Sequence, residues 1–304
     1  MMSKIVKGFK AEHRAYLNEL TFTLYMIRRS PLTVLGIGIV STLVILAILA
    51  PYIIPYPGDA YLNIHPERKL MPISLDHLFG TDDMGRDLFS RSIYGTRISL
   101  QVGAVVILVA AIVGVVLGGV SGYFGGVVDE AIMRITDAFL SIPSLVLALA
   151  VAATLGPGLN NAMAAIAVTW WPWYARLVRG QVLQIKQELY VEAAKAMGGG
   201  KLYIIFKHIM PNSLAPIVVN ASMDVGYAIL TAAALGFLGL GAQPPAPEWG
   251  LMISTGRKYM PTRWWYTTFP GLMIFTSVLG FNLLGDGLRD LLDPRLRRRG
   301  RVKR

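Results

Sequence analysis

The chain has 304 residues, of which 54% are hydrophobic and only 15% are charged, and its mean hydropathy is +0.52. Soluble proteins carry about 25% charged residues on average, so this composition excludes an ordinary soluble domain and indicates a membrane protein. The net charge of +11 does not indicate nucleic-acid binding, because the basic residues lie in the segments between and beyond the apolar blocks. The absence of cysteine excludes disulfides and thiolate metal sites.

Six apolar segments are expected to cross a membrane as helices. A helix needs about 20 apolar residues to span a hydrocarbon core of about 30 Å. The first segment follows a charged leader that is too long for an ordinary signal peptide, so we expect this helix to be retained. The predicted helices cover residues 32–54, 98–122, 131–155, 162–178, 212–240 and 267–284.

The connections between these helices differ in charge. Residues 1–31 carry six basic and two acidic side chains, residues 176–210 also carry six and two, and residues 286–304 carry eight and three. Residues 55–97, by contrast, carry five basic and six acidic side chains. Because loops rich in Lys and Arg stay in the cytoplasm, this asymmetry predicts an all-α protein of the cell membrane, with six spans and both termini cytoplasmic.

The chain is expected to divide into four parts along its length. These are a cytoplasmic leader with the first helix (1–60), an extracytoplasmic connection (61–97), a five-helix core (98–290) that contains a cytoplasmic loop (179–211), and a basic cytoplasmic tail (291–304). The lipid bilayer is therefore the first expected partner.

The second predicted helix carries a regular series of glycines. They recur at every fourth position, at residues 114, 118, 122 and 126. This spacing places the glycines on one face, so we expect that face to pack closely against another helix of the bundle.

Few charged residues lie inside the predicted spans. Asp224 lies near the middle of the fifth span, where a charge is costly and usually faces a cavity or a partner. It is expected either to line a translocation path or to bond to another helix. Arg134 and Asp137 are three residues apart and are expected to pair with each other. The four histidines do not share metal-ligand spacing, so no metal and no other cofactor is predicted.

The cytoplasmic loop contains a short predicted helix. Residues 189–197 are good helix formers, and the glycines at 198–200 are expected to end that helix. A second helical segment at 201–209 then leads to Pro211, where the fifth span begins. Because so short a helix is not stable alone, packing is expected to hold it, and its small residues suit a groove in another protein.

One motif in this loop has a specific spacing. Glu-Ala-Ala at 192–194 is followed by Gly198 and, thirteen residues further on, by Pro211. This arrangement resembles the Glu-Ala-Ala loop of ABC importer permeases, whose motif ends in Ile-x-Leu-Pro. At residues 208–210 this chain has His-Ile-Met in place of Ile-x-Leu, which keeps the helix–glycine–helix–proline order.

The resemblance extends over most of the chain. Residues 77–100, 237–250 and 282–290 are similar to signatures of the peptide/nickel group of these importers. The chain therefore resembles the C-type permease of the dipeptide/oligopeptide/nickel family. The first of these segments also has the glycine spacing of a P-loop, but Arg86 and Asp87 replace the phosphate-binding lysine and the hydroxyl residue. We expect a structured cap before the second helix rather than a nucleotide site.

The resemblance implies a type I ABC importer permease fold and a non-catalytic translocation subunit. Such a subunit would pair with a second, related permease, and two cytoplasmic ATPases and an extracytoplasmic solute-binding protein would complete the importer, without nucleic acid. Carried over by position, the ATPase-coupling element comprises Glu192, Ala193, Ala194, Met197, Gly198 and Pro211. Closing of the ATPases on ATP would move this element and switch the bundle between inward- and outward-facing states.

Di- and oligopeptides are the expected substrates, with oligosaccharides or nickel chelates as alternatives for the same architecture. A self-contained secondary transporter or channel is an alternative of another class, but it would need an ion site, and intramembrane charge is sparse. An intramembrane enzyme is a further alternative of another class. The predicted spans hold neither a Ser/His pair nor a His-Glu-x-x-His motif that would support it.

Overall fold

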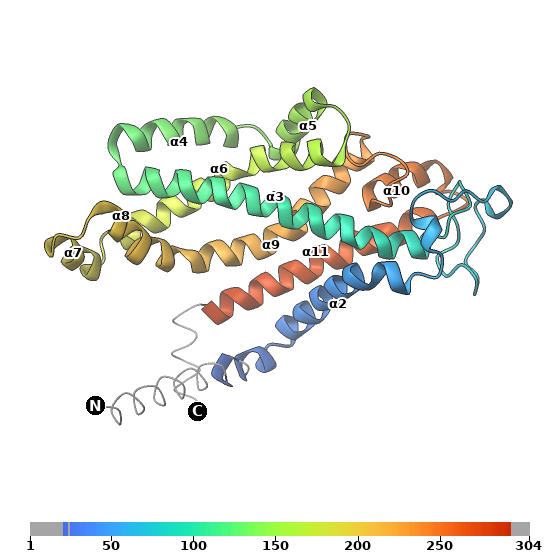
Figure 1. Cartoon of the computed structure of the whole chain (residues 1–304), viewed down its shortest axis with the longest axis horizontal. Coiled ribbons are helices and arrows are strands. Elements are labelled where there is room, and N and C mark those ends of the chain that lie inside the picture. Colours follow the sequence, from blue (N-terminus) through green and yellow to red (C-terminus); the bar gives the residue numbers. More distant parts are fainter. Residues whose placement is uncertain (1–20, 24, 293–304) are drawn as a thin grey trace.

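The computed structural model describes residues 21–23 and 25–292, which form a bundle of long helices (Figure 1). Within this part of the chain, the only β-structure is an isolated bridge between Thr81 and Asp87, so the predicted all-α class is confirmed for it. The basic leader up to residue 20 and the tail from residue 293 lie outside the described residues. The helices Leu189–Ala196 (α7) and Trp249–Gly256 (α10) lie at opposite ends of the bundle, named here the α7 end and the α10 end (Figure 1).

The helices follow one another in an order set by apolar runs, prolines and glycines. They are α2 (Pro31–Ile53), α3 (Leu88–Phe124), α4 (Gly126–Leu140), α5 (Ser144–Leu155), α6 (Leu159–Ile185), α7 (Leu189–Ala196), α8 (Lys201–Ile204), α9 (Met210–Phe237), α10 (Trp249–Gly256) and α11 (Trp265–Leu292). A π turn, Ile205–Ile209, joins α8 to α9. Short 3-10 turns lie at Pro57–Ala60, Pro66–Arg68 and Arg257–Tyr259.

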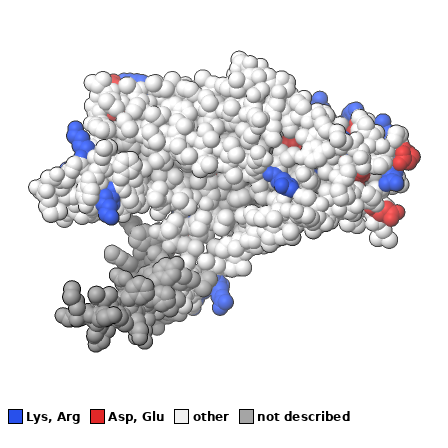
Figure 2. Space-filling model, in the orientation of Figure 1, with Lys and Arg blue, Asp and Glu red and all other residues white. Residues whose placement is uncertain are grey.

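Four helical segments of the described chain are long and apolar enough to cross a membrane: α2, α3, the segment Lys201–Phe237 that contains α9, and α11. α4 and α5 make a fifth if they count as one broken span. α6 is 27 residues long but is not among these segments. Figure 2 shows few charged side chains over the middle of the visible face and more at its two ends. The structure thus supports a membrane protein with four or five such spans, which is fewer than the six predicted.

The predicted third span is not one continuous helix. Residues 131–155 are divided between α4 and α5, whose axes differ by 89°. Pro143 lies at the break with extended backbone angles, because proline has no N–H to donate and its ring clashes with the preceding helical turn. Hydropathy alone did not reveal this break, since Ser141 and Ser144 are the only polar side chains near it and the rest of residues 138–151 are apolar.

α3 and α6 extend beyond the ends that hydropathy predicted. α3 begins at Leu88 rather than at residue 98, because the Asp87 side chain accepts a hydrogen bond from the Ser90 N–H and caps the helix. α6 continues to Ile185 rather than ending at residue 178. Arg179 in the added stretch pairs with a carboxylate on α4, so polarity at that point marks a contact between helices and not a helix end.

The glycine face of α3 packs against α6 through three of its four members. A Cβ added at Gly114, Gly118 or Gly122 would collide with α6, and at Gly118 it would meet the carbonyl group of Ala175. α3 and α6 therefore lie side by side at backbone contact (Figure 1). Gly126 is not part of this face, because it begins α4 with a φ of +56° and has open space around it.

Candidate functional site

The segment with the Glu-Ala-Ala motif protrudes from one end of the bundle, the same end at which α2 begins and α11 finishes (Figure 1). α7 covers Leu189–Ala196, which confirms the helix predicted at residues 189–197. α8, the π turn and α9 then form one continuous helical segment, Lys201–Phe237. This agrees with the prediction that a helical segment at residues 201–209 leads into the fifth span. Only the short turn at residues 197–200 separates α7 from this segment.

One narrow face holds α7 against the body of the protein. Val191 and Ala194, three residues apart, are buried. Val191 belongs to the same apolar cluster as Ile185, Ile204 and Ile209, which come from the end of α6 and the start of the next helical segment. Because eight residues do not form a stable helix alone in water, these contacts keep α7 folded and in place.

The opposite face of α7 is open. Glu192 and Ala193 are exposed, and Leu189 and Met197 expose 81% and 82% of their surface. Phe206 on the following π turn is also exposed, at 71%. Small and apolar side chains left uncovered on a short helix are typical of an element that enters a groove in a partner.

Gly198 ends α7 in a left-handed turn. Its φ is +83°, its N–H donates to the carbonyl of Lys195 at 2.9 Å, and the Gly199 N–H donates to the carbonyl of Ala194 at 3.0 Å. These two bonds form a Schellman motif, in which glycine is favoured because a side chain strains the backbone at positive φ. Pro211 lies in the first turn of α9 and is exposed.

Gly198→Ala is expected to destabilise the end of α7 by about 1–2 kcal/mol, because an alanine must adopt the left-handed conformation. No atom lies within 4 Å of the added Cβ, so the cost is confined to the backbone. Gly180→Ala is the matched control, since Gly180 also has open space but lies inside α6, where alanine is favoured. Hydrogen exchange of the α7 amides measures the effect, and equal protection in the two variants would contradict the assignment.

Asp224 on α9 lies beside a cavity of about 250 Å³ between α9, α6 and the break between α4 and α5. The Tyr174 hydroxyl on α6 donates a hydrogen bond to Asp224 Oδ2 at 2.7 Å. The expected bond to another helix is therefore present, while a place on a translocation path stays a prediction. The cavity wall includes Leu140, Ser144, Trp170, Trp173 and Tyr227.

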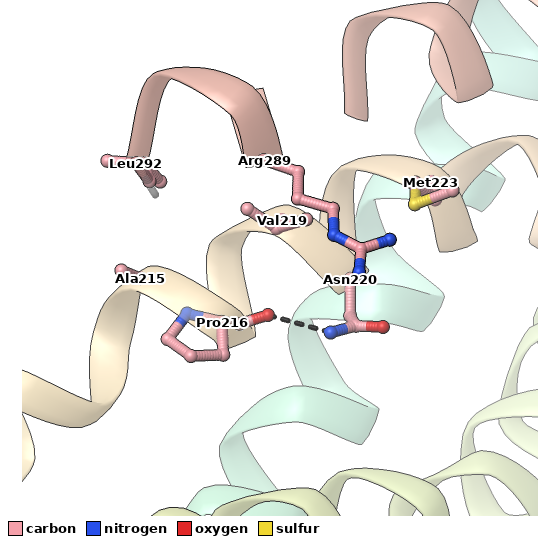
Figure 3. A pocket seen from close by; sticks show the side chains of 7 residues that line it. All are labelled: Ala215, Pro216, Val219, Asn220, Met223, Arg289 and Leu292. Carbon is pink, nitrogen blue, oxygen red and sulfur yellow. Dashed lines mark hydrogen bonds between the residues drawn. The ribbon is translucent and has the colours of Figure 1, made fainter. Parts of the chain in front are cut away.

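A second cavity, of about 430 Å³, lies between α9 and the last turns of α11. The Arg289 side chain extends into it toward Asn220, whose amide nitrogen donates to the carbonyl of Pro216 at 2.8 Å (Figure 3). Ala215, Val219, Met223 and Leu292 complete the lining. One wall of this cavity is basic, whereas the cavity beside Asp224 is acidic.

The segment at residues 77–100, expected to be a structured cap before the second helix, forms part of a buried polar junction at the α10 end. Arg91 on α3 is 3% exposed, and its Nη1 donates to the carbonyls of Asp59 and Ala60 at 3.1 and 3.2 Å. Its Nη2 donates to the carbonyl of Pro245 at 3.3 Å, and its Nε lies 3.5 Å from Asp82 Oδ2. One side chain thus joins the first connection, α3 and the α9–α10 connection.

The carboxylates of this junction are also occupied. Asp82 accepts the side chain of Arg86 at 2.7 Å and the backbone N–H groups of Met84 and Arg86 at 2.8 and 2.9 Å. Asp87 Oδ1 lies 2.9 Å from Nδ1 of His77. Because these N–H groups are already bonded within the loop, the P-loop spacing does not form a phosphate cradle, in agreement with the structured cap that we expected.

The loop before α10 is anchored in the same region. Glu248 is buried, and its carboxylate accepts the N–H groups of Gly250 and Leu251, both at 2.8 Å. Burial raises the pKa of Glu248, and these two N–H bonds act in the opposite direction. The Trp249 indole N–H donates to the carbonyl of Ser92 on α3 at 2.9 Å, which ties α10 to α3.

The predicted pair of Arg134 with Asp137 is wrong. Asp137 accepts from Arg176 on α6, while Arg134 lies 3.5 Å from Glu130, one turn earlier on α4. A contact between α4 and α6 therefore replaces the expected contact within one helix. The sequence could not reveal it, because the pairing follows from the packing of two helices about 40 residues apart.

Comparison with protein families gives two matches. Residues 114–298 match the model of the binding-protein-dependent transport system inner membrane component. Residues 23–72 match the N-terminal TM domain of oligopeptide transport permease C. Together the two matches include α2, the end of α3 and all helices from α4 to α11, so the predicted family is confirmed.

Curated relatives resemble the chain along most of its length. It is 49% identical to the probable D,D-dipeptide transport system permease protein DdpC of Escherichia coli K12, over 89% of this chain and 90% of that protein. It is 47% identical to the dipeptide transport system permease protein DppC of Alkalihalophilus pseudofirmus, over 89% and 88%. For the glutathione transport system permease protein GsiD of Pectobacterium atrosepticum, the identity is 46% over 85% of each chain.

Among solved structures, the fold is similar to a chain of the MetNI methionine ABC transporter in inward-facing conformations. The TM-score is 0.50 at 20% identity, over 73% of this chain and 100% of that chain, which is a likeness of fold alone. The family match over more than half of the chain, together with relatives close to half identical, shows that this chain belongs to the family of inner membrane permease components of binding-protein-dependent transport systems.

Proposed function

We propose that this chain is the translocation subunit of an ATP-driven importer of short peptides. Its family is that of transport permeases, and its relatives are named for dipeptides, D,D-dipeptides and glutathione, which are all short peptides. These names favour peptides over oligosaccharides or nickel chelates. The solute-binding protein of the system would deliver the peptide, and ATP hydrolysis would take place on partner subunits rather than on this chain.

The exposed face of α7 is the observation that carries the coupling part of this proposal. Glu192, Ala193 and Met197 would enter a groove of the ATPase, while Ala194 keeps α7 on the bundle and Gly198 gives the chain its turn. When the two ATPases close on ATP, they would move α7 relative to the bundle. Because α8 and the π turn continue directly into α9, that movement would be transmitted to a helix inside the membrane.

The proposal also includes six spans, with the α4–α5 pair as the third and α6 as the fourth. α6 is about 40 Å long, enough to cross a bilayer, and two of its arginines pair with acidic residues of α4. Six passes bring the start of α2 and the end of α11 to the α7 end, in keeping with Figure 1. The basic loop at that end supports a cytoplasmic position for it.

A second, related permease would complete the pathway. Trp173 and Tyr227 on the wall of the Asp224 cavity expose 53% and 51% of their surface. These side chains face out of this chain, so the cavity is open on one side. A homologous bundle placed against that side would close the cavity off from lipid and leave a path between the two permeases.

Glu192→Arg is expected to lower both co-purification with the ATPase and ATP-driven peptide uptake about tenfold or more. A reversed charge in an interface costs about 1.4 kcal/mol or more, which corresponds to that factor. Glu130→Arg is the matched control, because Glu130 is 68% exposed on α4 and makes only a 3.5 Å pair with Arg134. Normal ATPase association and uptake in the Glu192 variant would show that the coupling surface has been assigned wrongly.

A further inference from the structure

We propose that the cavity beside Asp224 binds the ammonium group of the peptide as it crosses the membrane. This inference rests on the proposed function and adds to it the chemistry of one binding position in the pathway. It depends on the free acceptor positions of the Asp224 carboxylate, on the aromatic side chains that line the cavity, and on the row of polar residues along one side of α9.

The Asp224 carboxylate has room for a cation. Among the described residues, the one hydrogen bond donated to it comes from the Tyr174 hydroxyl, at 2.7 Å. A carboxylate offers about four acceptor positions, so most of them remain available toward the cavity. None of the described residues that line the cavity is basic. A charge at this depth is costly without a partner, and a bound ammonium group would supply one.

The wall of the cavity is aromatic. Trp170, Trp173 and Tyr227 line it together with Tyr174, and the faces of such rings attract cations within about 6 Å. A carboxylate among aromatic rings favours an alkylammonium group and disfavours the carboxylate end of a peptide. At about 250 Å³, the cavity has the volume of roughly eight waters, enough for the first residue of a peptide.

The cavity lies on a polar face of α9. Asn220, Asp224, Tyr227 and Thr231 follow one another at intervals of four, three and four residues, which places them on one side of the helix. They extend over about 16 Å of the helix axis. A face of this kind is expected to border a water-filled path rather than lipid, so a peptide that follows it passes Asp224.

The first test measures binding to the purified transporter, assembled with its partner subunits, in the absence of ATP and binding protein. Saturation-transfer NMR is recorded with L-alanyl-L-alanine and with propionyl-L-alanine, which lacks only the ammonium group. We expect a dipeptide signal several-fold above that of the analogue, and Asp224→Asn should reduce it to the analogue's level. Asp286→Asn, the same change at an exposed position of α11, should leave it unchanged. Equal dipeptide signals in the Asp224 variant and the unchanged protein would overturn the proposal.

A second measurement uses the unchanged protein and so does not depend on the folding of a variant. The α-amino group of the dipeptide loses its proton near pH 8, so its affinity should fall more than tenfold between pH 7 and pH 9.5. Binding of propionyl-L-alanine is the control for titration of the protein. Equal behaviour of the two probes would contradict an ammonium site. Neither measurement requires transport, so absence of ATP-driven uptake would count against the proposed function alone.

Discussion

Arg91→Leu is expected to destabilise the protein by about 3–5 kcal/mol, because it leaves the buried Asp82 carboxylate without one of its cations and several buried carbonyls without a donor. The three segments that meet at this guanidinium would lose their common partner. Thermal unfolding of the purified protein should show a midpoint lower by roughly 10 °C.

Arg97→Leu is the matched control for this prediction. Arg97 lies six residues further along α3 and is exposed, and its guanidinium lies 5.5 Å from the ring centre of Tyr94. Loss of such an exposed cation–aromatic contact costs about 0.5–1 kcal/mol. If the two variants unfolded at the same temperature, the polar junction would not be the structural element that we describe.

Gly118→Ala is expected to destabilise the contact between α3 and α6 by about 1–3 kcal/mol. The added Cβ would meet the backbone carbonyl of Ala175, which cannot move as a flexible side chain can. The two helices must then separate, and with them the pairs that join α6 to α4. The thermal midpoint and the yield of monodisperse protein in detergent measure this effect.

The adjacent glycine provides the control. A Cβ at Gly119 would lie 3.7 Å from the sulfur of Met210, which is an ordinary contact. Gly119→Ala should therefore be neutral or stabilising by up to about 1 kcal/mol, since alanine is the better helix former. A larger loss for Gly119→Ala than for Gly118→Ala would mean that the glycine series does not mark the packed face.

Hydropathy located the helices whose ends coincide with changes in polarity. The predicted helix at residues 32–54 matches α2, and that at 212–240 matches α9 to within three residues at either end. The predicted helix at 267–284 matches α11 at its start but ends eight residues early. Charged residues such as Arg289 continue α11 without interrupting the helix.

The remaining errors arise where tertiary contacts satisfy polar groups or where a proline interrupts an apolar run. The first turns of α3 were missed because the charged residues Arg91 and Arg97 were taken to indicate a loop. Arg91 is in fact buried, and it donates to carbonyls of other segments. The break at Pro143 was missed because no charged residue lies beside it, and the two serines that flank it did not lower the hydropathy of the segment enough. The Asp137–Arg176 pair depends on the packing of α4 against α6, and a single sequence does not contain that information.

The candidate site was easier to predict than the packing around it. The position of α7, its end at Gly198 and the start of α9 near Pro211 follow from local helix chemistry, which a sequence encodes directly. The cavity beside Asp224 could not be predicted in the same way. Its walls come from α4, α5, α6 and α9, so its shape depends on how four helices pack.

Site-directed cross-linking between α7 and the ATPase tests the central claim most directly. The chain contains no cysteine, so Met197→Cys introduces a single reactive thiol at a position that is 82% exposed. Val127→Cys, at an 84% exposed position at the start of α4, is the control. We predict a cross-link from position 197 to the ATPase whose yield changes when ATP is bound, and little or none from position 127. A cross-link absent at 197, or unaffected by ATP, would contradict coupling through α7.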